Sequence, residues 1–141
     1  MERGYIYIHN NVLPTLLAIS ESEQQQGLMH QEWPPPVMSF VYAEPRINRF
    51  WMHNTPSPLD IVFCHEGKVS QLHIGEPFST KAIGNHQFSD LIIELPKGSV
   101  EKLGIQIGHE VGVLKPTSEE LRKIIAEKTY VFPKFYKPLA F

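Results

Sequence analysis

The sequence has little cysteine, no excess of positive charge and no long apolar run. Its 141 residues include one cysteine, Cys64, which excludes an internal disulfide and a zinc site built on cysteine pairs and favours a reducing compartment. A formal net charge of -2 offers no basic face for nucleic acid. No run approaches the roughly 20 apolar residues that cross a bilayer. Neither nucleic acid nor a membrane is therefore an expected partner.

Phosphate-binding glycine loops and paired metal ligands are also missing. The segments HIGEPFS, AIGN and IQIGHEVG match neither a P-loop nor a dinucleotide fingerprint, so no cofactor is expected. Seven histidines show no paired helical or finger-like spacing, so no metal site is predicted. The first residues lack the pattern of a signal peptide, which favours a cytoplasmic location, with a virion or a phage-infected cell as the alternative.

Proline and glycine, in contrast, are frequent. Twelve prolines and nine glycines separate short apolar runs, which favours many short strands over long helices. The predicted strands are Tyr5–His9, Thr15–Ser20, Val37–Tyr42, Arg49–His53, Leu59–Cys64, Val69–Ile74, Leu91–Leu95 and Glu110–Leu114. The fold class is therefore mainly β, or β-rich α+β: a single compact sandwich-like barrel with two or three short helices, one of them C-terminal.

Turn and cap signals refine this arrangement. Gly67 lies in a short turn and predicts that the strands on either side pair as a hairpin. Ser20 and Glu23 have the spacing of a capping box and predict a helix from residue 20 towards Gly27. Ser99 is the candidate N-cap of a second helix, which should stop at residue 104.

A third helix is predicted at residues 116–129, where a capping box precedes an apolar stripe. The expected organisation is therefore a β domain over residues 1–115, followed by a helix and an aromatic tail over residues 116–141. The tail should pack on the same domain or on a neighbouring subunit, because large apolar side chains gain about 1.5–3 kcal/mol each on burial. An oligomer formed through Phe132, Phe135, Tyr136 and Phe141 is one prediction.

The segment RFWMHNTPSPLDIVF, residues 49–63, has the most unusual composition. If its first residues are extended, Phe50 and Met52 share one face and Trp51 and His53 share the other. The prolines that follow predict a rigid turn. Asp60 then begins an apolar strand, where a carboxylate needs hydrogen-bond donors to remain charged. The nearest donors in sequence are Asn54, Thr55 and His53.

Two interpretations of this segment compete. In the first, Asp60 and Asn54 form a structural clasp that holds the proline turn. In the second, the segment is the wall of a small-ligand site, with methionine and aromatic side chains that adapt to a ligand. The candidate ligand-binding residues are Met29, Met38, Trp51, Met52, Asn54, Thr55 and Asp60.

The quoted residues resemble the DUF192 family, also called UPF0127. The hallmarks are Gly27-Leu28-Met29, then Met38 and Phe40, then FWMHNT at residues 50–55, then Pro58-Leu59-Asp60, and they extend to the later IIELPKGSVEKLGIQIGHEV. The resemblance covers about residues 12–114 and implies a compact, mostly β, sandwich-like barrel with one or two short helices. Departures include Gln31 and His53, where the family often has arginine and lysine. The family's function is unknown, so the resemblance supplies no reaction.

Three functions remain open at this point. The leading hypothesis is a noncatalytic small-ligand-binding or interaction module, in which the segment from Trp51 to Asp60 and the residues Gly27–Met29 line one depression. The alternative is a small enzyme that uses Asp60, helped by His53 or Asn54, for acid–base chemistry. The second alternative is a structural or assembly subunit of phage origin that makes its contacts through the tail.

Overall fold

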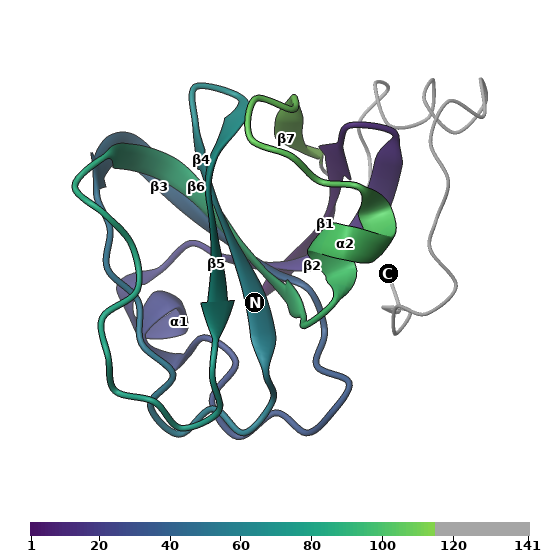
Figure 1. Ribbon diagram of the computed structural model, residues 1–141. Coiled ribbons are helices and arrows are strands. Elements are labelled where there is room, and N and C mark those ends of the chain that lie inside the picture. Colours follow the sequence, from purple (N-terminus) through teal and green to yellow (C-terminus); the bar gives the residue numbers. More distant parts are fainter. Residues whose placement is uncertain (115–141) are drawn as a thin grey trace.

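In a computed structural model, residues 1–114 form one curled β-sheet with two short helices (Figure 1). The strands are β1 (Glu2–Ile8), β2 (Asn11–Ala18), β3 (Met38–Ile47), β4 (Leu59–His65), β5 (Lys68–Gly75), β6 (Phe88–Pro96) and β7 (Val111–Leu114). The helices are α1 (Glu21–Gln26) and α2 (Ser99–Leu103). The structure describes residues 1–114, so the predicted C-terminal helix, the aromatic tail and its interface lie outside the described residues.

The strand order is β5-β4-β6-β3-β2-β1-β7, and all neighbours are antiparallel except β2 and β3. The sheet curls into a half-barrel whose two edges meet at one end. There the Val69 N–H donates to the His109 carbonyl at 3.0 Å, and the Gly108 N–H donates to the Val69 carbonyl at 2.8 Å. The predicted mainly β, barrel-like fold is confirmed.

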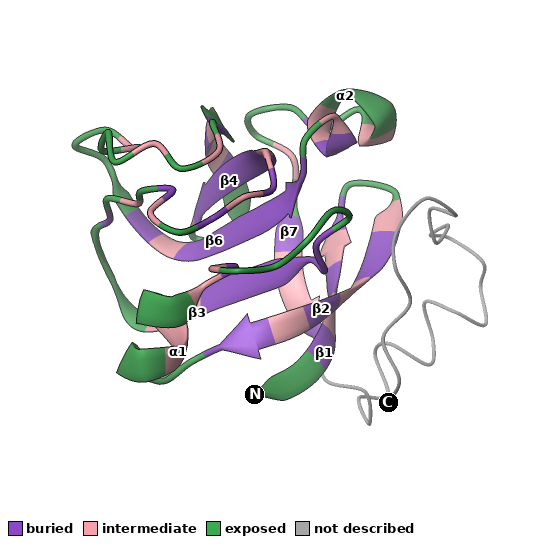
Figure 2. Cartoon of the chain, turned by 90° about the horizontal axis from the view of Figure 1, so that it is seen from below, coloured by how far each residue is buried: buried purple, intermediate pink, exposed green. Residues whose placement is uncertain are grey.

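Both faces of the central strands are covered, because β4, β6 and β3 place apolar side chains on each side. Leu59, Ile61 and Phe63 of β4 pack in one cluster, while Val62 and Cys64 pack in the other, as the period-two alternation predicts. Figure 2 shows the burial along β4 and β6 and the exposed surface of α1. A charged residue on one of these strands therefore enters the interior when it occupies a position that the alternation assigns to an apolar side chain.

The local signals for turns and caps are mostly confirmed. Ser20 and Glu23 form the predicted capping box, in which the Ser20 hydroxyl accepts from the Glu23 N–H and the Glu23 carboxylate accepts from the Ser20 N–H. Glu66 and Gly67 form the turn between β4 and β5 with φ values of 51° and 77°. The second helix starts differently from the prediction, because its N-cap is Gly98 and no side chain of its own segment caps it.

The predicted strand at Arg49–His53 is wrong. Phe50 makes a single bridge to Ile83, with N–H to carbonyl distances of 2.9 and 2.8 Å, and no ladder follows. The chain turns directly afterwards, where Asn54 adopts a left-handed φ of 52° and the Thr55 N–H donates to the Met52 carbonyl. The predicted alternation survives without a strand, because Met52 is fully buried whereas the neighbouring tryptophan is half exposed.

No helix within residues 1–114 has the length and apolar character needed to cross a membrane.

Candidate functional site

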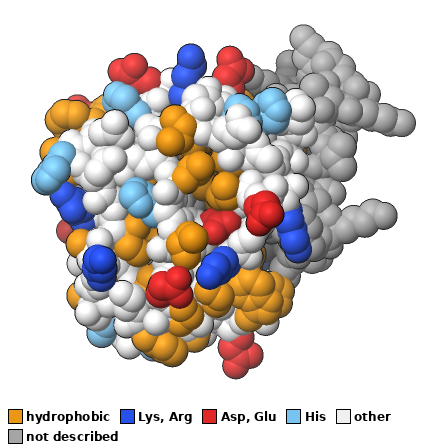
Figure 3. Space-filling model, in the orientation of Figure 1, with side chains coloured by type: hydrophobic (Ala, Val, Ile, Leu, Met, Phe, Trp, Pro, Cys, Tyr) orange, Lys and Arg blue, Asp and Glu red, His pale blue; other side chains and the backbone are white. Residues whose placement is uncertain are grey.

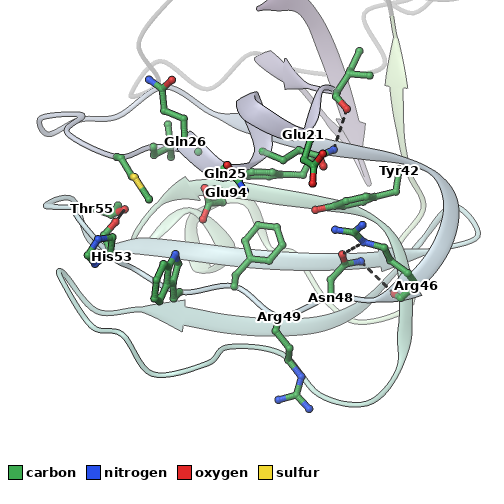
Figure 4. A pocket seen from close by; sticks show the side chains of 18 of the residues that line it. Glu21, Gln25, Gln26, Tyr42, Arg46, Asn48, Arg49, His53, Thr55 and Glu94 are labelled. Atoms are coloured by element: carbon green, nitrogen blue, oxygen red, sulfur yellow. Dashed lines mark hydrogen bonds between the residues drawn. The ribbon is translucent and has the colours of Figure 1, made fainter.

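A groove of about 880 Å³ opens between three segments that are distant in sequence (Figure 4). One wall is α1 with the turn that follows it, the second is the outer half of β3, and the third is the irregular segment 48–55. This volume is within the range of small-molecule sites, about 300–1,000 Å³. The irregular segment forms a wall because it leaves the sheet after β3 and returns to it only at β4.

Glu94 of β6 lies at the floor of the groove. The register places it between Met38 of β3 and Ile61 of β4, both of which are buried. Its neighbours in sequence, Ile93 and Leu95, point to the opposite face of the sheet, so alternation forces the Glu94 side chain into the apolar cluster under the groove. The carboxyl group therefore occupies a position at which the pattern would otherwise place another aliphatic side chain.

The Glu94 carboxyl group has no counter-ion among residues 1–114. The residue is 4% exposed, and within those residues no hydrogen bond or ion pair reaches its side chain. Burial raises the pKa of Glu94 to about 8, because removal from water penalises the charged form and no neighbouring cation offsets this. At neutral pH the group is mainly a protonated acid, able to donate one hydrogen bond and to accept others.

The aromatic side chains of Phe40, Phe50 and Trp51 line the same groove as this acid. Phe40 and Phe50 meet edge to face with centroids 4.8 Å apart, and the Trp51 ring lies against the His53 ring at 4.7 Å. Trp51 is 51% exposed although it is the largest side chain of the groove, so its ring is available to another molecule. Aromatic walls around one fixed polar group are typical of small-ligand sites.

The arginines that line the groove are held elsewhere. The Arg46 guanidinium lies 4.3 Å from the centre of the Tyr42 ring and donates from Nε to Asn48 Oδ1 at 2.9 Å. Arg49 points away from the groove in Figure 4, and its Nη2 lies 3.3 Å from His86 Nδ1. Burial raises the pKa of the Tyr42 phenol, and Arg46 opposes that shift. Neither cation neutralises the acid at the floor.

The backbone at the Gly27 corner allows the groove to reach Glu94. Gly27 follows α1 with a φ of 49°, which glycine adopts at little cost. A Cβ at this position would lie 3.4 Å from the Phe40 ring and 3.7 Å from Glu94 Oε1, so the glycine itself faces the acid. Met29, two residues on, then lines the same wall.

The structure separates the predicted site residues into three groups. Met29, Trp51, Thr55 and His53 line the groove, and so do the residues Gly27 and Leu28 that were expected to share one depression with them. Met38 and Met52 are instead core residues, 2% and 0% exposed, so they support the floor without lining it. Asn54 and Asp60 are not part of the groove lining.

Asp60 is a structural clasp, although not the clasp that the sequence suggested. Its Oδ2 accepts from the N–H groups of Gly98 at 3.1 Å and Val100 at 2.9 Å, so it caps the start of α2. The expected donors, Asn54 and Thr55, do not bond to it, because alternation along β4 turns Asp60 to the other face of the sheet. Asp60 and His53 line different concavities, so the geometry does not combine them for acid–base chemistry.

Among residues 1–114, no three histidine, cysteine, aspartate or glutamate side chains gather around one point. Cys64 is buried in the core, as its apolar context predicts, and burial raises the pKa of its thiol. It therefore behaves as a small apolar side chain.

Sequence reasoning missed Glu94, although a signal was present. In LIIEL the glutamate is the one charged residue of a five-residue apolar run, and the apolar neighbours on both sides, with two β-branched isoleucines before it, indicate a strand that is buried on two faces. A charge in such a run is rarely buried without a partner or a function.

Comparisons with known proteins agree with this fold. The model of the DUF192 family, described as "Uncharacterized ACR", matches residues 8–113. A solved structure of a proposed transcription regulator from Sinorhizobium meliloti 1021 is 28% identical, with a TM-score of 0.73 over 79% of this chain and 93% of that chain. A protein of unknown function from Novosphingobium aromaticivorans DSM 12444 is 25% identical, with a TM-score of 0.73 over 78% of this chain and 84% of that chain. No curated protein matches the sequence.

Proposed function

The chain belongs to the DUF192 family, whose description names no activity, and from the geometry of its groove we propose that it is a small-molecule-binding module. The observation that carries the proposal is Glu94, an acid at the floor of a groove with aromatic walls that has no counter-ion within residues 1–114. A buried carboxyl group in an apolar cluster lowers stability, so its presence is best accounted for by a ligand that it recognises.

In the proposed binding mode, the walls and the floor of the groove contact different parts of the ligand. The exposed ring of Trp51 and the edge of Phe50 would cover the apolar part of the ligand, and Glu94 would fix its polar end. Because Trp51 makes its main ring contact with His53 and stays half exposed, its removal should cost the fold little while it removes one wall of the site.

A fragment screen by thermal shift tests this proposal with a matched pair of variants. Trp51→Ala removes a groove wall, whereas Trp33→Ala removes a tryptophan that is similarly exposed, at 55% against 51%, but lies outside the groove lining. Fragments that raise the Tm of the wild type should fail to raise that of Trp51→Ala and should still raise that of Trp33→Ala. If no fragment raises the Tm, or if both variants respond as the wild type does, the proposal is wrong.

The Sinorhizobium relative is described as a proposed transcription regulator, and a ligand-binding role for this chain is compatible with that description. Direct contact with DNA is less favoured. The net charge is -2, and on the face shown in Figure 3 acidic and basic side chains are interspersed without a basic patch. Strong retention on duplex DNA at physiological salt would argue against this preference.

We also propose a cytoplasmic location, because the one cysteine, Cys64, is a buried thiol, which suits a reducing compartment. Cell fractionation checks the proposal, and recovery of the protein only among exported proteins would contradict it.

A further inference from the structure

In the part of the chain that the structure describes, Glu94 is the one charged group of the groove lining that is buried without a partner. The other titratable residues of the lining come from all three walls and are Glu21 of α1, Tyr42 and Arg46 of β3, and Arg49 and His53 of the segment 48–55. Glu21, Arg46 and Arg49 are exposed, so water already solvates their charges. The position at Glu94 is the place in the groove where a ligand charge would meet an uncompensated group.

The environment of Glu94 favours a cation over an anion or a neutral group. An anion at this position would face a carboxyl group, which disfavours negative charge. A cation would pair with the carboxylate, and the half-exposed ring of Trp51 in the same groove is available for a cation–π contact. The groove's own guanidinium at Arg46 already uses this interaction on Tyr42.

The groove also has the shape to hold an apolar body beside that charge. Phe40 and Phe50 both line the groove and meet edge to face, with ring centroids 4.8 Å apart. The exposed ring of Trp51 adds a second surface. A small aliphatic cation would leave these surfaces in water, whereas a cation that carries a ring would cover them.

We propose that the ligand class of this groove is a small organic ammonium ion with an aromatic or aliphatic body, whose charged nitrogen pairs with Glu94. This inference rests on the proposed function and names the chemistry of its ligand. Binding transfers no group between the protein and the ligand. The one bond that breaks is the O–H bond of the Glu94 acid. Its proton goes to solvent, and the ammonium ion then pairs with the carboxylate. The free protein holds that proton at neutral pH, so binding competes with protonation.

Three probes of nearly equal shape separate the effect of the ligand's charge on affinity from the effect of its shape. They are benzylammonium, benzyl alcohol and benzoate. Their dissociation constants are measured by titration of ¹⁵N-labelled full-length protein, followed at the Gly27 amide and the Trp51 indole. Benzylammonium should bind most tightly. Its affinity should rise about fifty-fold from about pH 6 to about pH 8, because a cation can bind only after the acid, with its pKa of about 8, has lost its proton.

Two variants give the controls. Glu94→Gln keeps the size of the side chain but cannot ionise, so benzylammonium should lose its advantage over benzyl alcohol and the pH dependence should disappear. Glu44→Gln removes an exposed carboxylate of the same strand as Tyr42 that lies outside the groove lining, and it should change neither result.

The possible outcomes distinguish this inference from the proposed function. If benzyl alcohol or benzoate binds in the groove as tightly as benzylammonium and Glu94→Gln makes no difference, the cation assignment is overturned while groove binding stands. If none of the three probes shifts the groove signals but fragments from the thermal-shift screen still bind through Trp51, the cation assignment alone is overturned. If neither experiment finds a ligand, both proposals are overturned.

Discussion

Replacement of Glu94 by glutamine is expected to remove a pH dependence from the stability of this domain. Glu94 has a folded-state pKa of about 8 against an ordinary value of 4.5, so between these values the folded state holds a proton that the unfolded state has lost. The free energy of unfolding therefore falls as pH rises through this window and is constant below and above it. Glutamine does not titrate, so the variant lacks this contribution.

The magnitude follows from the two pKa values. Each pKa unit corresponds to about 1.4 kcal/mol, so the full window is worth about 5 kcal/mol, of which about 2.7 kcal/mol falls between pH 6 and pH 9. Urea denaturation of both proteins at several pH values in this range gives the difference in unfolding free energy, in which all other titrating groups cancel. Glu94→Gln should gain about 2.7 kcal/mol relative to the wild type from pH 6 to pH 9. A difference that stays constant across this range would refute the view of Glu94 as a buried acid without a counter-ion.

Three further substitutions test the fold around the groove. Asp60→Asn weakens the acceptor that caps α2 and should cost about 1–3 kcal/mol in urea denaturation without a change in groove binding; a cost below about 0.5 kcal/mol would contradict the clasp. Gly75→Ala should cost about 1–3 kcal/mol, because its Cβ would collide with Met52, and a Met52→Ala background should reduce that cost; strict additivity would exclude the collision. Ser20→Ala removes one half of the capping box and should cost about 1 kcal/mol, measured in the same way, while an unchanged midpoint would show that the box is dispensable.

Much of the fold could be predicted from sequence because its signals are local. The alternation of Leu59, Ile61 and Phe63, the turn at Gly67 and the capping box at Ser20 each depend on residues a few positions apart, and the structure confirms them. The prediction of a strand at Arg49–His53 failed because an irregular chain that packs on one side only also satisfies the apolar alternation of this segment.

The site was harder to predict because it depends on contacts between distant segments. Sequence predicted Trp51 and Met29 in one depression, and both line the groove, but it could not show which methionines would be covered, and Met52 is a core residue. Asp60 drew attention because it lies within the most distinctive motif, whereas Glu94 lies in an ordinary strand. The function of a carboxyl group depends on what faces it, and for Glu94 that is decided by α1 and by the irregular segment, more than 30 residues away in sequence.

The most direct test of the central claim is a ¹³C NMR titration of the Glu94 side-chain carboxyl group, without and with benzylammonium. The account predicts a pKa of about 8 in the free protein and a clear downward shift when the cation is present, because the bound ammonium ion stabilises the carboxylate. An ordinary pKa, near 4.5, in the free protein, or a raised pKa that the cation leaves unchanged, would contradict it.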